Sequence, residues 1–240
     1  MEFLLIARRD LTAYITGWYG PIIIAILVFL CGVAYNFSAL GAGAQLSTKV
    51  LEQFFFLAGI ATGFAAWLMS MRAIAEEKQT RTELVLLTSP IADWKIVLGK
   101  YLAVMGMVLL FTLCTVHMPL MIQVHGKVSL AQILVGYSGM LLYGSSVAAV
   151  GVFASALVRS QLLAAVISGG FVVFFVLLWT GTAVIGGTMG EIAANAAIWD
   201  KHFQPFQKGD LAFVHVFYYI SFTWVFLLLA TQALGRRRWQ

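Results

Sequence analysis

Six long stretches of the sequence contain no Lys, Arg, Asp or Glu, and they constrain the fold more than any other feature. They are residues 11–48, 53–71, 101–126, 128–158, 160–190 and 211–235. About 20 apolar residues cross the hydrocarbon core of a bilayer as a helix, so each stretch is long enough for one crossing. No segment alternates with a period of two, as the strands of a membrane β-barrel do. The pattern predicts an all-α membrane protein with six transmembrane helices.

Composition argues against a water-soluble protein. Hydrophobic residues make up 61% of the chain and charged residues only 10%, whereas an ordinary soluble domain has roughly 25% charged residues. No internal repeat, linker or low-complexity tract divides the sequence. We therefore expect residues 1–240 to form a single transmembrane domain, with spans near 18–35, 54–71, 97–123, 130–158, 162–185 and 213–234.

The basic residues predict an orientation. With the N-terminus in the cytoplasm, the cytoplasmic segments hold eleven of the 15 Lys and Arg residues and the opposite side holds four. Cytoplasmic loops of membrane proteins carry such an excess, so we expect both termini in the cytoplasm of a multi-pass inner-membrane protein. The net charge of +5 is thereby explained by topology, with the lipid bilayer as partner and no nucleic acid.

A short amphipathic helix is predicted before the first span. Apolar residues recur at helical spacing on one stripe: Phe3, Leu4, Ala7, Leu11 and Tyr14. The charged residues of this segment include Arg8, Arg9 and Asp10. Such a helix lies in the membrane interface. The alternative is that it simply extends the first span.

Residues 72–100 are the most highly charged segment, with nine of the 25 formal charges. Residues 72–88 are predicted to form a helix, in which Glu77 and Arg81 make a favourable pair four residues apart. Ser89 and Pro90 suit a turn that begins a second helix, with Asp93 near its N-terminus. A charged helix with an apolar end suits docking into a soluble partner, while the alternative is a solvated loop that only turns the chain.

Residues 71–90 resemble the cytoplasmic signature of type 2 ABC-transporter permeases. The matching positions are Thr82, Glu83, Leu86, Leu87, Pro90, Gly99 and Lys100. Arg81 is a departure, because the family usually has Gly there. Residues 7–11 look like the interfacial start of the family, with Asp10 in place of Glu. Residues 202–210 and the pair Tyr218–Tyr219 resemble the last outer loop and span of the gliding-motility-associated branch.

The resemblance implies a permease domain that couples ATP hydrolysis by a separate cytoplasmic ABC ATPase to substrate translocation. It implies a second permease copy or a paralogue as partner, and allows a periplasmic or auxiliary membrane subunit. The loop after span two would be the coupling helix. Its contact with the ATPase would involve Glu76, Glu77, Arg81, Thr82 and Glu83, and the N-terminal helix would share the docking surface. A non-transporting machine driven by an ATPase, for motility or force transmission across the envelope, is the alternative.

Small residues at a spacing of four predict close helix contacts. Gly59 and Gly63 form such a pair in span two, and Gly151 and Ser155 form one in span four. Small residues let the backbones of membrane helices approach closely. These pairs fit packing within the subunit or a dimer interface.

Enzyme functions find little support. The nucleotide-binding pattern G-x-x-x-x-G-K-[ST] is absent, so we expect no cofactor on this chain, with ATP and Mg on the partner ATPase. The four histidines (His117, His125, His202 and His215) lack metal-ligand spacing. The spans contain no Asp, Glu or acid–base pair, which disfavours a membrane-embedded enzyme. Gly186, Gly187 and Gly190 fit either a broken or re-entrant helix or a simple loop.

Overall fold

The computed structural model describes residues 2–40, 46–80, 91–180 and 186–235. Within these residues, six helical segments are long and apolar enough to cross a membrane, which confirms the predicted fold class. Their long helices are α2 (Tyr19–Leu40), α3 (Ser47–Ser70), α6 (Asp93–Thr115), α8 (Leu130–Leu157), α9 (Gln161–Leu177) and α13 (Phe213–Gly235). The shorter helices are α1 (Glu2–Thr16), α4 (Ala75–Gln79), α7 (His117–His125), the 3₁₀ turn η1 (Leu178–Thr180), α11 (Gly187–Asn195) and α12 (Asp200–Lys208).

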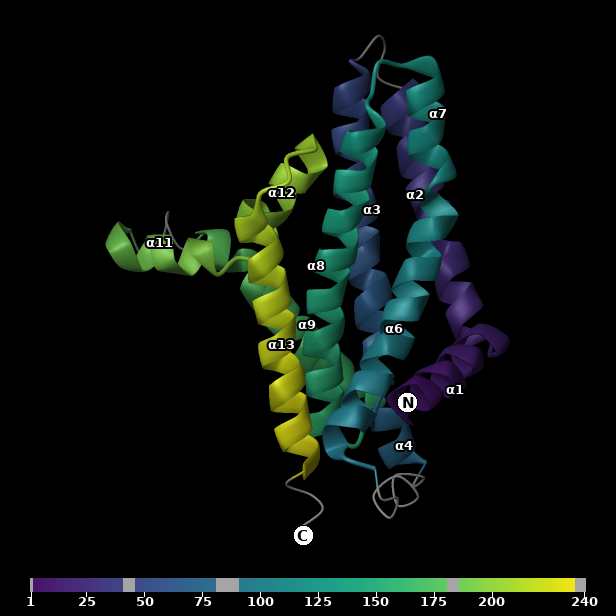
Figure 1. Cartoon of the computed structure of the whole chain (residues 1–240), viewed down its shortest axis with the longest axis vertical. Helices are drawn as coiled ribbons and strands as arrows, with labels where there is room; N and C mark the ends of the chain where they lie inside the picture. Colours follow the sequence, from purple (N-terminus) through teal and green to yellow (C-terminus); the bar gives the residue numbers. More distant parts are fainter. Residues whose placement is uncertain (1, 41–45, 81–90, 181–185, 236–240) are drawn as a thin grey trace.

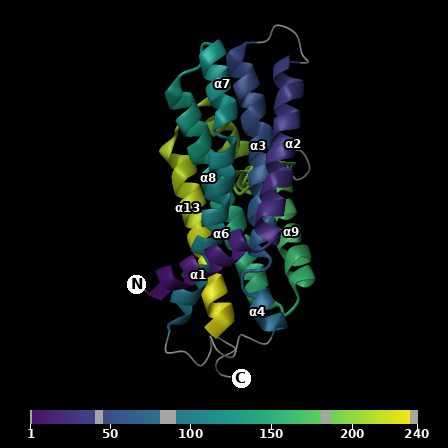
Figure 2. The ribbon, with the colours of Figure 1, turned by 90° about the vertical axis from the view of Figure 1, so that its right-hand side faces the viewer.

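The long helices run side by side as a bundle (Figures 1 and 2). More than half of the most apolar stretch of α3, α6 and α8 is buried, whereas under a quarter of the corresponding stretch of α2, α9 and α13 is. The central helix α8 has glycines where large aromatic side chains of its neighbours pack, Phe55 against Gly136 and Phe206 against Gly139. We call the end of the bundle that carries α1, α4 and the last turn of α13 the terminal end (Figure 1).

The N-terminal helix α1 is separate from the first span, because the chain bends at Gly17 and Trp18. It crosses the side of the bundle at the terminal end (Figure 2) and packs on α6. A Cβ on Gly99 of α6 would lie 2.8 Å from the carbonyl oxygen of Phe3, so the missing side chain permits this approach. The predicted apolar stripe is only partly correct, because Leu4 is exposed while Asp10 is buried on the packed face.

The third span is two helices instead of the single predicted one. Helix α6 ends at Thr115 and α7 begins at His117. Pro119 explains the break, because proline has no N–H to donate to the carbonyl four residues earlier, that of Thr115. The two helices still form one apolar segment, Asp93–Val124.

The highly charged segment also differs from its prediction. Helix α3 ends at Ser70, and after four turn residues α4 covers only Ala75–Gln79, in place of a helix starting at residue 72. Residues 81–90, including the predicted Ser89–Pro90 turn, lie outside the described residues. Helix α6 begins at Asp93 after an extended Ala92, three residues later than predicted, and Asp93 lies in its first turn as expected.

The segment between α9 and α13 folds into two short helices. Helix α9 ends at Leu177, earlier than the predicted residue 185, and residues 181–185 lie outside the described part. Gly186 and Gly187 take positive φ values of 66° and 61°, which glycine adopts without steric cost. Helix α11 then projects sideways from the bundle, while α12 packs against α8 and α3 (Figure 1). The broken-helix interpretation is therefore closer than the simple loop.

Candidate functional site

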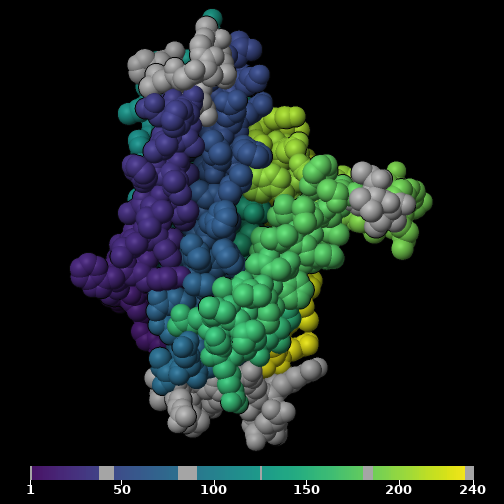
Figure 3. All heavy atoms as spheres, turned by 180° about the vertical axis from the view of Figure 1, so that it is seen from behind, coloured from purple at the N-terminus to yellow at the C-terminus, as the bar shows by residue number. Residues whose placement is uncertain are grey.

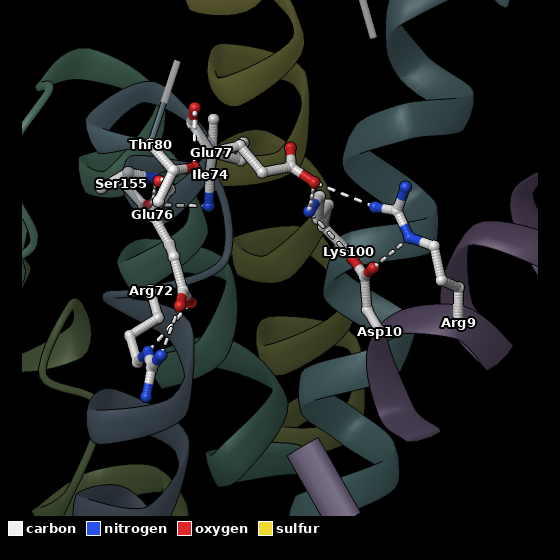
Figure 4. A network of polar contacts seen from close by, with 10 residues as sticks. Arg9, Asp10, Arg72, Ile74, Glu76, Glu77, Thr80, Lys100 and Ser155 are labelled. Carbon is white, nitrogen blue, oxygen red and sulfur yellow. Dashed lines mark hydrogen bonds and ion pairs between the residues drawn. The ribbon is translucent and has the colours of Figure 1, made fainter. Parts of the chain in front are cut away.

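Four charged side chains meet beside α4 at the terminal end of the bundle (Figure 4). Glu77 Oε1 accepts hydrogen bonds from Arg9 Nη2 at 2.9 Å and from Lys100 Nζ at 2.5 Å. Lys100 Nζ also lies 2.9 Å from Asp10 Oδ2, and Arg9 Nε donates to Asp10 Oδ1 at 2.8 Å. Two cations and two carboxylates thus form a balanced network that joins α1, α4 and α6.

Burial makes this network more than a surface feature. The side chain of Lys100 is only 5% exposed, that of Asp10 12% and that of Glu77 17%. Removing one partner of a buried ion pair leaves an uncompensated charge and is strongly destabilising, by about 3–5 kcal/mol. The ion pairs therefore hold α4 in a defined position against α1 and α6.

A second contact fixes α4 to the end of α8. Ser155 Oγ accepts from the backbone N–H groups of Ile74 and Ala75 at 2.9 and 2.7 Å. These N–H groups belong to the start of α4, where no intrahelical acceptor exists. In return, Lys78 Nζ donates to the carbonyl oxygen of Ala156 at 2.5 Å and to that of Ser155 at 3.4 Å. Each helix thus satisfies the unpaired backbone groups of the other.

A third contact joins the end of α3 to the start of α2. Arg72 Nε donates to Glu76 Oε2 at 2.9 Å, with a second bond from Arg72 Nη2 to Glu76 Oε1. The guanidinium carbon of Arg72 lies 4.2 Å from the centre of the Tyr19 ring. Tyr19 Oη donates to the carbonyl oxygen of Leu68 at 2.8 Å. Helix α4 is thereby connected directly to α1, α6 and α8, and through Arg72 to α2 and α3.

The predicted ATPase-contact residues fall into two groups. Glu76 and Glu77 lie on α4 and are engaged in ion pairs within the chain, whereas Arg81, Thr82 and Glu83 lie outside the described residues. Of the interfacial residues, Arg9 and Asp10 belong to the network and Arg8 is exposed on α1.

Sequence reasoning missed Lys78 and Lys100 as members of this site. For Lys100 a signal was available, because Gly99 and Lys100 match the permease pattern: one lets α1 approach and the other pairs with Asp10. For Lys78 none was available, because its acceptors lie on α8, far along the chain.

The four small residues predicted to mediate helix contacts all face other parts of the same chain. A Cβ on Gly59 would collide with the Phe203 ring of α12, and one on Gly63 would lie 2.8 Å from the hydroxyl of Tyr143. A Cβ on Gly151 would collide with the side chain of Ser70. Ser155 contacts the start of α4, as described above.

An apolar groove of about 370 Å³ lies between α3 and α9, with α8 as its floor. Figure 3 shows this face, where α9 crosses at an angle beside α3. The lining residues are Ile60, Gly63, Phe64, Trp67, Tyr143, Gly169, Val172, Val173, Val176 and Trp199. Trp199, from the segment before α12, packs against Tyr143 and Phe56 with ring centres 5.0 and 5.7 Å away.

Two polar contacts attach α9 on either side of the groove. Trp67 Nε1 of α3 donates to Ser168 Oγ at 2.9 Å and to the carbonyl oxygen of Ala165 at 3.1 Å. Further along α9, the carbonyl oxygen of Phe175 accepts from the backbone N–H of Ile198 at 3.2 Å. The groove is therefore framed by α9 contacts both to a span and to the segment before α12.

A family model described as ABC-2 family transporter protein matches residues 43–240, which is most of the chain. The chain belongs to the ABC-2 transporter family. This supports the coarser part of the prediction, a membrane permease component of the type that acts with a separate ATP-binding subunit. The match covers α3 to α13, whereas α1 and α2 precede it. No curated protein matches the sequence at a significant level.

Proposed function

We propose that this ABC-2 family chain is a permease subunit in which α4 transmits the motion of a separate ATPase to the spans. The observation that supports this best is the attachment of α4 on several sides. Glu77 joins it to α1 and α6, and Ser155 joins it to α8. A short helix fixed in this way passes a displacement to the bundle, whereas a loosely solvated loop would absorb it.

The roles of the predicted contact residues divide accordingly. We assign Glu76 and Glu77 to holding α4 in place, because their carboxylates are paired within the chain. We assign the ATPase contact itself to Arg81, Thr82 and Glu83, which follow α4 directly in the sequence. The exposed Arg8 of α1 extends that docking surface.

The apolar groove between α3 and α9 is our candidate for part of the translocation pathway. Its lining is nearly all hydrocarbon or aromatic, with the Tyr143 side chain in its wall. The groove is open on the face shown in Figure 3, so a second copy of the chain or a paralogue seated there would enclose it. A pathway with such walls favours substrates with substantial apolar surface.

The proposed orientation places the terminal end of the bundle in the cytoplasm of a bacterial inner membrane. The excess of basic residues in α1, the α3–α6 connection and the C-terminal segment supports it. ATP and Mg would bind to the partner subunit. We also propose the gliding-motility-associated branch, on the resemblance of residues 202–210 and of Tyr218–Tyr219, which allows a mechanical role in the envelope.

Copurification with an ATPase tests this function. The tagged chain is purified from native membranes, the ATP-binding partner is identified by mass spectrometry, and ATP hydrolysis is measured in nanodiscs. We expect Glu83→Lys to reduce ATPase recovery strongly, while Glu191→Lys on the exposed face of α11 leaves it unchanged. Absence of an ATP-binding partner, together with full activity of Glu83→Lys, would refute the proposal.

A further inference from the structure

Two histidines that are far from metal-ligand spacing in the sequence contact each other beside the groove. His202 of α12 is 5% exposed, and its Nδ1 lies 2.9 Å from Nδ1 of His215 on α13. The other ring nitrogen of His202, Nε2, lies 3.0 Å from the carbonyl oxygen of Asn195. The His202 ring also stacks on Tyr218, with ring centres 3.7 Å apart and planes inclined by 4°.

These contacts fix the protons of the pair. A carbonyl oxygen only accepts, so Nε2 of His202 carries the hydrogen. Neutral His202 then has a lone pair on Nδ1, and His215 must donate from its own Nδ1. One added proton can be shared, because His215 can move its own hydrogen to Nε2 and accept at Nδ1. A second added proton leaves no lone pair on either Nδ1, so the hydrogen bond is lost and two cations face each other.

The surroundings of His202 disfavour its protonation. Burial lowers the pKa of His202 below its usual value and outweighs the hydrogen bond to Asn195, which raises it, while the nearby His215 and Lys201 lower it further. No charged residue occurs in α8, and the α3 residues packed closest to the α12 region, Phe56 and Gly59, are uncharged. His215 is half-buried, which leaves the pair within reach of solvent protons.

The pair also holds a segment that shapes the groove. Residues 195–198 include the end of α11 and part of the turn before α12. Three of their backbone carbonyl oxygens accept hydrogen bonds from side chains. His202 donates to the carbonyl of Asn195, Tyr218 Oη to that of Ala196 and Tyr219 Oη to that of Ile198, the last two at 2.7 Å. The next residue is Trp199, which lines the groove.

We propose that the His202–His215 pair is a proton-operated latch that holds the 195–199 segment, and with it Trp199, in the wall of the α3–α9 groove. With His202 neutral, the latch is closed and the segment is fastened. When both rings have taken up a proton from solvent, the contact between His202 and His215 breaks, the two cations repel, α12 loosens from α13, and Trp199 is released from its position. The latch concerns the shape of the groove and does not depend on an ATPase partner.

Hydrogen–deuterium exchange of the full chain in nanodiscs tests the latch. Between about pH 7.5 and about pH 5, corrected for intrinsic amide exchange, we expect exchange in peptides covering 195–203 to rise by up to about a hundredfold per pH unit, the slope for two linked protons. His202→Gln should remove this rise. His117→Gln should keep it, because His117 of α7 is exposed and its Nδ1 lies 2.9 Å from the carbonyl oxygen of Cys114, away from the 195–203 segment in the sequence. A flat wild-type profile, or a rise that persists in His202→Gln, would overturn the proposal.

A measurement on the unaltered protein guards against a misfolded variant. Nitrogen-15 NMR of histidine-labelled chain at neutral pH, assigned with single His→Gln variants, reports which ring nitrogen carries hydrogen. We expect hydrogen on Nε2 of His202 and on Nδ1 of His215. The latch is ruled out if His202 is charged at neutral pH or if His215 carries its hydrogen on Nε2 alone.

Discussion

Ser155 and Lys78 each hydrogen-bond to backbone groups at the end of the other's helix. The Ser155 hydroxyl accepts hydrogen bonds from the N–H groups at the start of α4, and the Lys78 ammonium donates to the carbonyls at the end of α8. Both side chains are buried. The two helices belong to segments roughly eighty residues apart in the sequence. This pair therefore depends on the folded bundle and not on local helix propensity.

Replacing Ser155 with Ala should destabilise the chain. Two buried backbone N–H groups lose their acceptor, and an unsatisfied buried donor costs about 1–3 kcal/mol. Thermal unfolding in detergent should show a lower midpoint for Ser155→Ala. Ser138→Ala on the same helix is the control, because Ser138 Oγ donates to a carbonyl of its own helix, that of Val135. Equal midpoints for the two variants would contradict the capping role.

Replacing Lys100 with Met should destabilise the chain by about 3 kcal/mol, because Asp10 and Glu77 would keep their charges without the buried cation. The double variant Lys100→Met, Glu77→Gln should recover part of the loss, since Arg9 and Asp10 then remain as a balanced pair. Denaturant unfolding of the single and double variants measures this coupling. No recovery in the double variant would show that Lys100 acts through packing alone.

Replacing Gly59 with Ala should disturb the contact between α3 and α12. The added Cβ would collide with the Phe203 ring and meet Trp199 at 3.0 Å, and overpacking costs about 1–3 kcal/mol. Gly170→Ala on α9 is the matched control, because nothing lies within 4 Å of its added Cβ. That variant should change stability by no more than about 1 kcal/mol. Thermal unfolding of both variants separates steric overlap from helix propensity.

Acidification should lower the unfolding midpoint through His202. Its pKa is lowered in the folded chain from 6.5, so the unfolded chain binds more protons once the pH falls below that value. The contribution of His202 to stability is complete above about pH 6.5 and is lost as the pH falls through the lowered pKa. The decrease in midpoint between about pH 7.5 and about pH 5.5 should be smaller in His202→Gln than in the wild type. An identical decrease would exclude His202 as its source.

The sequence predicts the parts of this molecule that depend on long runs of residues. The charge-free stretches identify all six spans, because the bilayer demands apolar length at each crossing. The break at Val116 can be predicted from the sequence, because Pro119 follows it closely. The network of Arg9, Asp10, Glu77 and Lys100 cannot, because it joins three helices that only tertiary packing brings together.

The same limit applies to the histidines. His202 and His215 are thirteen positions apart in the sequence, and a turn of unpredictable shape lies between their helices. The spacing of histidines in the sequence indicates only whether neighbouring residues can bind one metal ion, and it says nothing about contacts between separate helices. Contact between them depends on α12 folding back against α13, which a periodic pattern does not reveal.

The two attachments of α9 limit how the groove widens. Trp67 fastens the helix at Ala165 and Ser168, and Ile198 fastens it at Phe175. A helix attached at two points cannot rotate as a rigid body about either one. Between these points lie Gly169 and Gly170, where a helix bends most readily. With both attachments intact, any widening of the groove requires α9 to bend between them.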